Sequence, residues 1–246
     1  MKKTTKSTVR LDKYLADNGA GTRSEVKDRI RKNRVTVNGQ IVRQPEMKID
    51  PENDRVELDQ KWIRPHPEFV YYLLNKPAGY VSATTDPKEK TVLDLIGSDA
   101  KGLFPVGRLD KDTEGLLLIT NDGALSHQLL SPNRHVDKTY YVETERPLTG
   151  EEAARLEEGV DIGEKRPTLP ARAELLPPEG EKGRLHLTIH EGKFHQVKRM
   201  IHAVGTEVTY LRRISMGDLA LPDDLPAGKV VEIDGESIKK SFTDGQ

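Results

Sequence analysis

The chain has 246 residues, which is enough for one large domain or two modest ones. It contains no cysteine, which excludes disulfides, thiolate catalysis and Cys-ligated zinc, and it has no run of about 18 apolar residues that could span a membrane. The N-terminus is basic but lacks the apolar core of a signal peptide, so we expect a cytoplasmic protein.

Charge is distributed unevenly along the chain. Residues 1–48 carry 13 Lys and Arg against 5 Asp and Glu, whereas the remainder carries 26 against 35. Such asymmetry predicts a basic binding module joined to an acidic body. A small domain that is merely rich in lysine would give the same count.

The first predicted elements are two helices. Apolar side chains recur at helical spacing over residues 9–16, and a second helix is expected to begin near Thr22 or Ser24, either of which can cap it. This second helix carries a basic stripe of three side chains, Arg23, Lys27 and Arg31. The stripe lies opposite the apolar Val26 and Ile30, which is typical of a helix that contacts phosphates, although a solvated helix face has the same pattern.

A β-hairpin is predicted over residues 34–42, because Asn38-Gly39 separates two short strands, and a further strand is predicted over residues 49–58. The order helix, helix, Val-Thr-Val-Asn-Gly resembles the S4 RNA-binding domain. The resemblance implies a module over residues 8–60 that binds structured RNA. Two prolines then predict an extended linker over residues 61–68.

The second unit, expected over residues 69–238, alternates strand and helix patterns. The predicted strands are 69–76, 116–120, 138–142, 160–162, 171–175, 184–190, 208–214 and 229–233. The predicted helices are 91–97, 124–130, 149–158 and the segment that follows a turn at 191–195. We expect residues 177–180 to form a loop, because they begin with two prolines, and residues 239–246 to form a polar tail.

A charged loop joined to a buried strand is the most informative stretch of this unit. The segment Gly107-Arg108-Leu109-Asp110-Lys111-Asp112-Thr113-Glu114-Gly115 holds five charged side chains and continues directly into an aliphatic run that ends on Asn-Asp-Gly. A loop fastened to the core in this way can hold a carboxylate at the edge of a cleft. A solvated turn before a strand would have the same composition.

Residues 107–123 resemble the signature of the small-ribosomal-subunit (RsuA-like) family of pseudouridine synthases. The stretch Leu-Asn-Lys-Pro-Ala-Gly-Tyr, residues 74–80, resembles the first motif of the same family. The resemblance implies a cleft across a mainly antiparallel mixed sheet, so that the whole chain is of the α+β class. It also implies that Asp110 is the catalytic residue.

Two later motifs match the family in the same order. Lys138-Thr139-Tyr140 resembles its Lys-x-Tyr motif, which implies that Tyr140 packs on the target base; the residues alone equally allow a half-buried strand tyrosine. Residues 191–200 resemble the family's Glu-Gly-Arg-Tyr-His-Gln-Val-Lys-Arg-Met motif, with Lys193 and Phe194 as departures. The match implies that Lys198 is the partner of Asp110 and keeps it ionised.

The resemblance implies isomerisation of uridine to pseudouridine in ribosomal RNA by base flipping. In its length and in the segment Arg213-Ile214-Ser215-Met216-Gly217 the chain resembles the small-subunit enzymes more than their large-subunit relatives, which implies 16S RNA as the target over 23S RNA. Asp110 can serve as nucleophile or as base. The expected RNA-binding residues are Arg108, Arg23, Lys27, Arg31, His195, Gln196 and Arg199. A non-catalytic RNA-binding assembly protein and an N-glycosidase that does not rejoin the base are the alternatives.

Cofactors and metals are not expected. His190, His195 and His202 are close in sequence, but no Cys or acidic ligand is spaced among them as in known metal sites. The chain also has no glycine-rich nucleotide-binding loop. The expected partner is ribosomal RNA or a small-subunit assembly intermediate, and we expect a monomer because RNA supplies the large interface.

Overall fold

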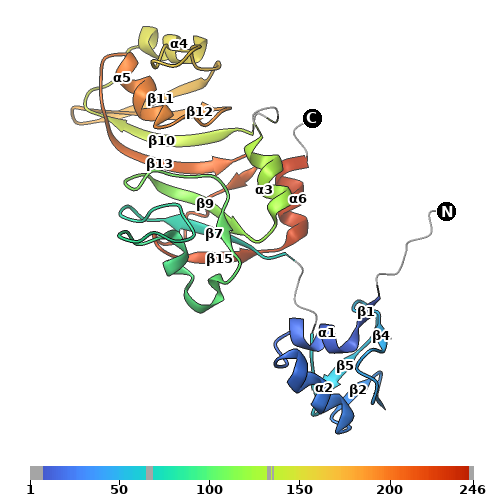
Figure 1. The fold of residues 1–246 in the computed structure, drawn as a ribbon. Helices are drawn as coiled ribbons and strands as arrows, with labels where there is room; N and C mark the ends of the chain where they lie inside the picture. The colour runs from blue at the N-terminus through green and yellow to red at the C-terminus, as the bar shows by residue number, and fades with distance from the viewer. Residues whose placement is uncertain (1–7, 65–68, 132–133, 135, 244–246) are drawn as a thin grey trace, which may run out of the picture. The chain divides into compact units, whose positions relative to one another are not determined.

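The computed structural model describes residues 8–64, 69–131, 134 and 136–243. The chain divides into two compact units, residues 1–68 and residues 69–246 (Figure 1). Each unit has apolar cores of its own. No helix among these described ranges is both long and apolar enough to cross a membrane.

The N-terminal unit packs two helices on short strands. Its elements are β1 (Val9–Arg10), α1 (Leu11–Asp17), α2 (Arg23–Arg31), β2 (Val35–Val37), β3 (Gln40–Ile41), β4 (Lys48–Ile49), β5 (Val56–Leu58) and β6 (Lys61–Trp62). Of the two predicted cap residues, Thr22 caps α2, and it forms a reciprocal capping box with Glu25. Asn38 and Gly39 both adopt positive φ angles, of 53° and 80°, as the predicted two-residue hairpin turn requires.

Two boundaries of this unit differ from the sequence prediction. The strand expected over residues 49–58 is two strands, β4 and β5, separated by a turn. Residues 61–62, expected in the linker, form β6 and pair with β5, because Glu57 and Leu58 still offer a free edge there. The two prolines of the expected linker lie outside the described residues.

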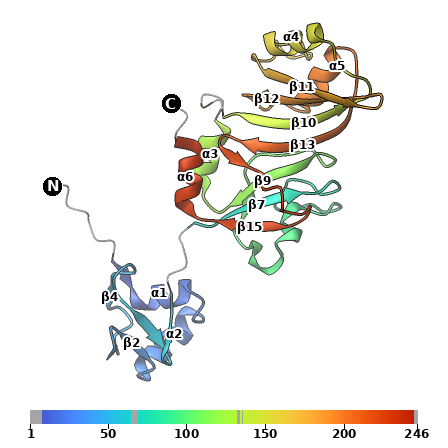
Figure 2. The same cartoon turned by 180° about the vertical axis from the view of Figure 1, so that it is seen from behind.

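A large mixed sheet forms the centre of the second unit (Figures 1 and 2). Its main strand order is β11-β12-β10-β13-β9-β7-β15, with β14 beside β13 and β8 beside β9. The strands are β7 (Tyr71–Lys76), β8 (Phe104–Pro105), β9 (Glu114–Thr120), β10 (Lys138–Thr144), β11 (Arg172–Glu179), β12 (Lys182–Ile189), β13 (Val208–Met216), β14 (Leu219–Ala220) and β15 (Val230–Ile233). Among the described pairings of these named strands only β13 with β9 is parallel, which agrees with the predicted mainly antiparallel α+β domain.

Helices cover both faces of this sheet. The helical segments are η1 (Val92–Leu95), η2 (Gly97–Ala100), α3 (Gly123–Leu130), α4 (Gly150–Glu158), α5 (Gln196–Ala203) and α6 (Gly235–Thr243). Leu117 and Ile119 of β9 belong to the core that includes α4 and α5, whereas Leu116 and Leu118 belong to the core that includes α3 and α6. A strand buried on both faces is apolar throughout, which explains the aliphatic run after the charged loop.

Three predictions for this unit are wrong. Residues 160–162 form no strand. Pro177 and Pro178, expected in a loop, lie in β11, which tolerates them because it is the edge strand and its register shifts at that point. The expected polar tail begins inside α6, since Ile238 is buried in the core beneath the sheet and extends the helical segment to Thr243.

Candidate active site

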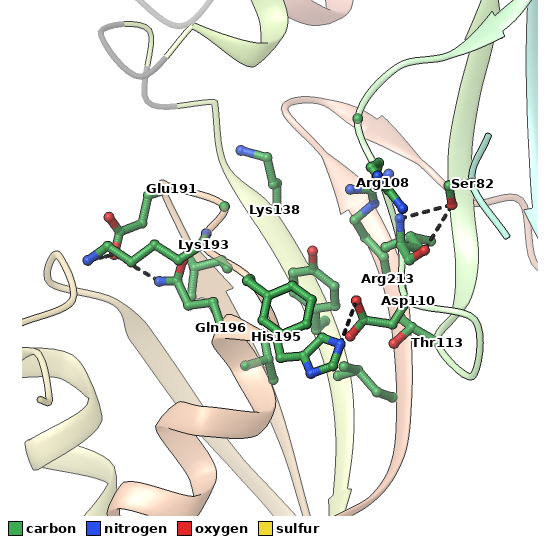
Figure 3. Close-up of a pocket in the computed structure, with 18 of the residues that line it drawn as sticks. Ser82, Arg108, Asp110, Thr113, Lys138, Glu191, Lys193, His195, Gln196 and Arg213 are labelled. Carbon is green, nitrogen blue, oxygen red and sulfur yellow. Dashed lines mark hydrogen bonds and ion pairs between the residues drawn. The ribbon is translucent and has the colours of Figure 1, made fainter. Parts of the chain in front are cut away.

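A cavity of about 760 Å³ lies between the loop of residues 107–113, strands β10 and β13, and the segment of residues 189–198. Figure 3 shows Asp110 and His195 facing each other across it. Volumes of this size are typical of small-ligand sites. The cavity brings together the three predicted catalytic residues, Asp110, Tyr140 and Lys198, from segments that are far apart in the sequence.

Lys76 of β7 fixes the backbone of the loop that carries Asp110. Its side chain is 0% exposed, and its Nζ donates to four carbonyl oxygens at 2.8–3.2 Å: those of Pro77, Asp110, Lys111 and Thr113. Burial lowers the pKa of this amino group from 10.5 to about 8. An ammonium group has three N–H donors, so the four carbonyl oxygens share three hydrogen atoms. Three of these carbonyls, those of Asp110, Lys111 and Thr113, belong to the loop that carries Asp110.

Ser82 fixes the same loop just before Asp110. Its Oγ donates to the carbonyl oxygen of Leu109 at 2.9 Å and accepts from the Leu109 N–H at 3.1 Å (Figure 3). The backbone is therefore held on both sides of the carboxylate. Neither Lys76 nor Ser82 was predicted as a site residue from the sequence; the signal for Lys76 is its place in the Asn-Lys-Pro motif.

Asp110 lies between two basic groups and is 28% exposed. Its Oδ2 is 3.4 Å from the Nζ of Lys198, and its Oδ1 is 3.5 Å from the Nε2 of His195. Lys198 makes shorter contacts with Asp112, at 2.6 and 2.8 Å, and this hydrogen bond lowers the pKa of the Asp112 carboxyl. Lys198 is thus shared between two carboxylates, whereas the sequence indicated only one.

Tyr140 is buried and forms part of the cavity wall. It lies on β10, directly opposite Arg213 of β13. Its ring therefore forms one wall of the cavity that Asp110 faces, and a flat base can pack against such a wall. Tyr140 thus lies in the cavity, and its role in packing on the base stays a prediction.

The turn before α5 places His195 at the cavity. His195 adopts a φ of 50°, which is unusual for a residue with a side chain, and its ring stacks on Phe194 with centroids 3.8 Å apart. Phe194 itself is 74% exposed. Gln196 stabilises the turn, because its amide accepts from the Lys193 N–H and donates to Glu191, both at 2.9 Å.

Two of the predicted RNA-binding residues have partners within the protein. Gln196 is buried and both ends of its amide have partners within the turn. Arg199 donates to the carbonyl oxygens of Ile162 and Phe194 and to the carboxylate of Glu164, so it holds the 162–164 loop against α5. Contact of these two side chains with RNA stays a prediction.

Arg108 is exposed at the cavity wall and has no ion pair with any residue in the described ranges. Its neighbour Asp110 points into the same space (Figure 3). Among the described residues nothing pairs with this exposed guanidinium beside Asp110, and its contact with RNA stays a prediction.

The predicted basic stripe of the N-terminal unit is organised by a buried carboxylate. Asp12 is 0% exposed and receives two hydrogen bonds from Arg10, at 2.9 and 3.0 Å. Arg23 and Lys27 approach the same carboxylate at 4.0 and 3.9 Å. Arg31 has no ion pair within residues 8–64. The sequence analysis predicted Arg23 and Lys27 but not the acid between them.

Metal ligands do not converge in the part of the chain that the structure describes: no three or more His, Asp or Glu side chains are placed to hold a metal ion there. The nearest partner of His195 is instead the Asp110 carboxylate.

Comparison with known proteins identifies the family. Residues 70–203 match the family described as RNA pseudouridylate synthase, and residues 9–56 match the S4 domain. The "Uncharacterized RNA pseudouridine synthase YtzG" of Bacillus subtilis (strain 168) is 43% identical over 232 residues, covering 94% of this chain and 97% of the relative. The "Ribosomal small subunit pseudouridine synthase A" of Escherichia coli (strain K12) is 41% identical over 232 residues, covering 94% and 98% respectively.

A solved structure agrees with these sequence matches. The "Crystal structure of pseudouridylate synthase" is 37% identical with a TM-score of 0.66, covering 95% of this chain and 99% of that chain. Family, domain order and fold are therefore consistent. This chain belongs to the RNA pseudouridylate synthase family and carries an S4 domain in front of its synthase domain.

Proposed function

We propose that this RNA pseudouridine synthase acts on 16S RNA of the small ribosomal subunit, with Asp110 as its catalytic carboxylate. Several relatives of similar length are named for the small subunit, among them the Escherichia coli protein. The observation that carries the catalytic assignment is the position of Asp110, held by a clamped loop between Lys198 and His195 in one cavity with Tyr140.

The reaction explains why this set of groups is sufficient. The C1′–N1 bond of uridine breaks, the uracil turns, and a C1′–C5 bond forms, after which the proton on C5 is lost and N1 is protonated. Atoms and electrons balance within the nucleotide, so the isomerisation itself consumes no oxidant and no phosphate energy. It requires a carboxylate at the ribose, a surface that retains the detached uracil, and access to a base that is normally stacked.

Each requirement has a candidate residue. Asp110 would act at the ribose, either as nucleophile or as base. Tyr140 would pack on the uracil, and its hydroxyl could move the C5 proton. Lys198 would pair with the Asp110 carboxylate and hold it at the ribose, an attraction that Asp112 shares because it contacts the same ammonium group.

Base flipping would give the uridine access to this cavity. The target atoms are not accessible in a stacked helix, so the nucleotide must leave it. Arg108 is exposed next to Asp110 and would occupy the vacated space or bind a nearby phosphate. His195, which is half-buried and stacks on the exposed Phe194, would contact the RNA at the cavity entrance.

The S4 domain would supply most of the RNA affinity through Arg23, Lys27 and Arg31. We propose that the chain acts as a monomer in the cytoplasm, because a folded RNA or a small-subunit assembly intermediate already supplies a large interface.

Tritium release tests the proposal. Wild type should release tritium from C5-labelled uridine in small-subunit RNA, and Asp110→Asn should release none above background while its RNA affinity stays within about threefold, because the S4 domain is expected to supply most of the affinity. Asp223→Asn is the matched control, since it removes the same charge from an exposed position that does not line the cavity and should keep full activity.

Large-subunit RNA assayed in parallel separates the alternatives. Release only from large-subunit RNA would contradict the small-subunit target and keep the chemistry. RNA binding without release from either sample would favour the non-catalytic assembly protein. Free uracil in the supernatant would favour the N-glycosidase.

A further inference from the structure

Two cations in the cavity wall have no carboxylate partner. Arg213 of β13 is 2% exposed; its Nε donates to the Leu116 carbonyl oxygen at 2.8 Å, and its Nη2 has no hydrogen-bond partner among the described residues. Lys138 of β10 donates only to the Val136 carbonyl oxygen, at 2.8 Å, within the same ranges. Neither side chain forms an ion pair in the described part of the chain, although both line the cavity.

The nearby carboxylates are already engaged. Asp137, next to Lys138 in sequence, is 2.6 Å from the ring of His190. Glu191, whose charge also acts on Lys138, bonds Lys193 at 3.2 Å and Gln196 at 2.9 Å. Neither of these two carboxylates forms an ion pair with Lys138 or Arg213.

Such an arrangement is costly without a ligand. A guanidinium cannot lose its proton in a protein, and a buried donor without a partner costs about 1–3 kcal/mol. Burial, and then repulsion from Arg213, lowers the pKa of Lys138 to about 8, so the two cations are close enough to destabilise each other. An anion between them would relieve both costs.

The register of the sheet indicates which anion fits. Arg213 is paired directly with Tyr140, and such partners have Cβ atoms about 5 Å apart on one face of a sheet. A base packed on Tyr140 with its ribose at Asp110 therefore leaves its own phosphate within reach of the cationic wall. Figure 3 shows Arg213 on the same side of the cavity as Asp110, with Lys138 on the neighbouring strand.

We propose that Arg213 and Lys138 form a subsite that binds the 5′-phosphate of the uridylate whose base enters the cavity. This subsite rests on the proposed uridine chemistry and adds a group that the catalytic carboxylate does not contact. It would hold the sugar in place after the glycosidic bond breaks, since the phosphate stays anchored while the uracil turns.

Binding of small nucleotides tests the subsite directly. Uridine 5′-monophosphate, uridine and inorganic phosphate are titrated into the full chain, and the guanidinium N–H signals of Arg213 are followed by NMR. The monophosphate should shift these signals saturably and bind about tenfold more tightly than uridine, which corresponds to one charged hydrogen bond. Lys138→Met and Arg213→Lys should each remove most of that preference while leaving uridine binding unchanged.

Lys101→Met is the matched control, because Lys101 is an exposed lysine of the same unit that does not line the cavity. It should bind like wild type. Equal affinity for uridine and its monophosphate, absence of saturable binding, or a Lys138→Met variant with full preference would each overturn the subsite. Inorganic phosphate that binds as tightly as the monophosphate would show a site for free phosphate and would overturn it too.

The preference for the monophosphate is measured by binding and does not depend on catalytic turnover. Asp110→Asn should keep the preference for the monophosphate even though it releases no tritium. If wild type showed the preference but modified no ribosomal RNA, the proposed target would fail and the subsite would stand.

Discussion

At the scale of single residues, buried charges organise the groups that face RNA. Asp12 is fully buried yet lies at the centre of Arg10, Arg23 and Lys27. A carboxylate in this place holds three long, flexible cations near one another before RNA arrives, which reduces the entropy lost on binding. An acidic residue can therefore strengthen the binding of a polyanion.

We expect Asp12→Asn to weaken RNA binding by about threefold to tenfold, although it removes a negative charge, because the three cations lose their common anchor. Fluorescence anisotropy with small-subunit RNA at several salt concentrations measures this. Asp17→Asn, an exposed acid on the same helix, is the control and should bind RNA as tightly as wild type or slightly more tightly. Tighter binding by Asp12→Asn would show that its carboxylate merely repels RNA.

Lys76 gives the protein a predictable dependence of stability on pH. The pKa is about 8 in the folded chain and 10.5 in the unfolded chain, so between these values the unfolded chain binds more protons. The free energy of unfolding contributed by this group therefore rises with pH through that window, by up to about 3 kcal/mol.

Urea unfolding at a series of pH values checks this. The stability of wild type relative to Lys76→Met should increase between pH about 8 and 10.5, whereas wild type relative to Lys101→Met should stay constant. If the difference in stability between wild type and Lys76→Met did not change with pH, the four carbonyl oxygens around Nζ would be keeping the amino group protonated across this range.

Residues at the site differ in how far the sequence could predict them. Asp110 and Lys198 lie close together as their motifs imply. Each motif fixes the position of its residue relative to a strand or helix of the fold, Asp110 just before β9 and Lys198 at the start of α5. Gln196 and Arg199 occupy the same polar helix face, and nothing in the sequence reveals that each finds partners inside the fold. The roles of Asp12 and Arg213 were not predicted for a related reason. Each role depends on burial of the side chain, and burial is not expected from a charged residue type.

At the scale of elements, one close approach joins the catalytic loop to the sheet. Gly115 ends the charged motif with a φ of 98°, and it lies opposite Arg213 where β9 and β13 run parallel. A Cβ on Gly115 would lie 2.2 Å from the Arg213 carbonyl oxygen and 2.8 Å from its nitrogen. Both of these atoms belong to the backbone, so the clash cannot be relieved by rotation of a side chain.

Gly115→Ala should lower the free energy of unfolding by at least about 2 kcal/mol, because it adds both backbone strain and a clash. Gly123→Ala at the start of α3 is the matched control: nothing lies within 4 Å of its Cβ, so stability should be unchanged or slightly higher. Denaturant unfolding followed by circular dichroism compares the two. Equal stability of both variants would show that β9 can move away from β13 at little cost.

Elements with a clear period were predicted well and irregular ones were not. The hairpin at Asn38-Gly39 and the capped helices at Thr22 and Thr149 follow local rules, so local sequence is sufficient. By contrast, β11 keeps two prolines because it lies at an edge, and α6 forms because Ile238 enters a distant core. Tertiary position decides such elements, and the sequence does not show it.

At the scale of the whole molecule, the described apolar cores do not cross between the two units. Most of the excess positive charge lies in the N-terminal unit, and the synthase unit is acidic. The uneven distribution of charge along the sequence thus coincides with the division of the fold between residues 68 and 69, although residues 61–62 form a strand of the N-terminal unit and not part of a linker.

A fragment of residues 69–246 should therefore unfold cooperatively, with the same urea midpoint as the synthase unit of the full chain. Its affinity for small-subunit RNA should fall by about tenfold or more, and the dependence of affinity on salt should become shallower, since fewer phosphate contacts release counterions. The control is the full chain in the same titration. An unchanged salt slope would place the main RNA contacts in the synthase unit.

The pairing of β15 with β7 has a consequence for biosynthesis. The first strand of the synthase sheet begins at Tyr71, and its neighbour β15, which ends at Ile233, is translated long after it. The S4 domain can fold while the ribosome is still making the sheet, for a period on the order of ten seconds at bacterial elongation rates. A nascent chain would then recognise RNA before it could modify it, and ribosome-bound intermediates stalled ahead of β15 should bind RNA without releasing tritium.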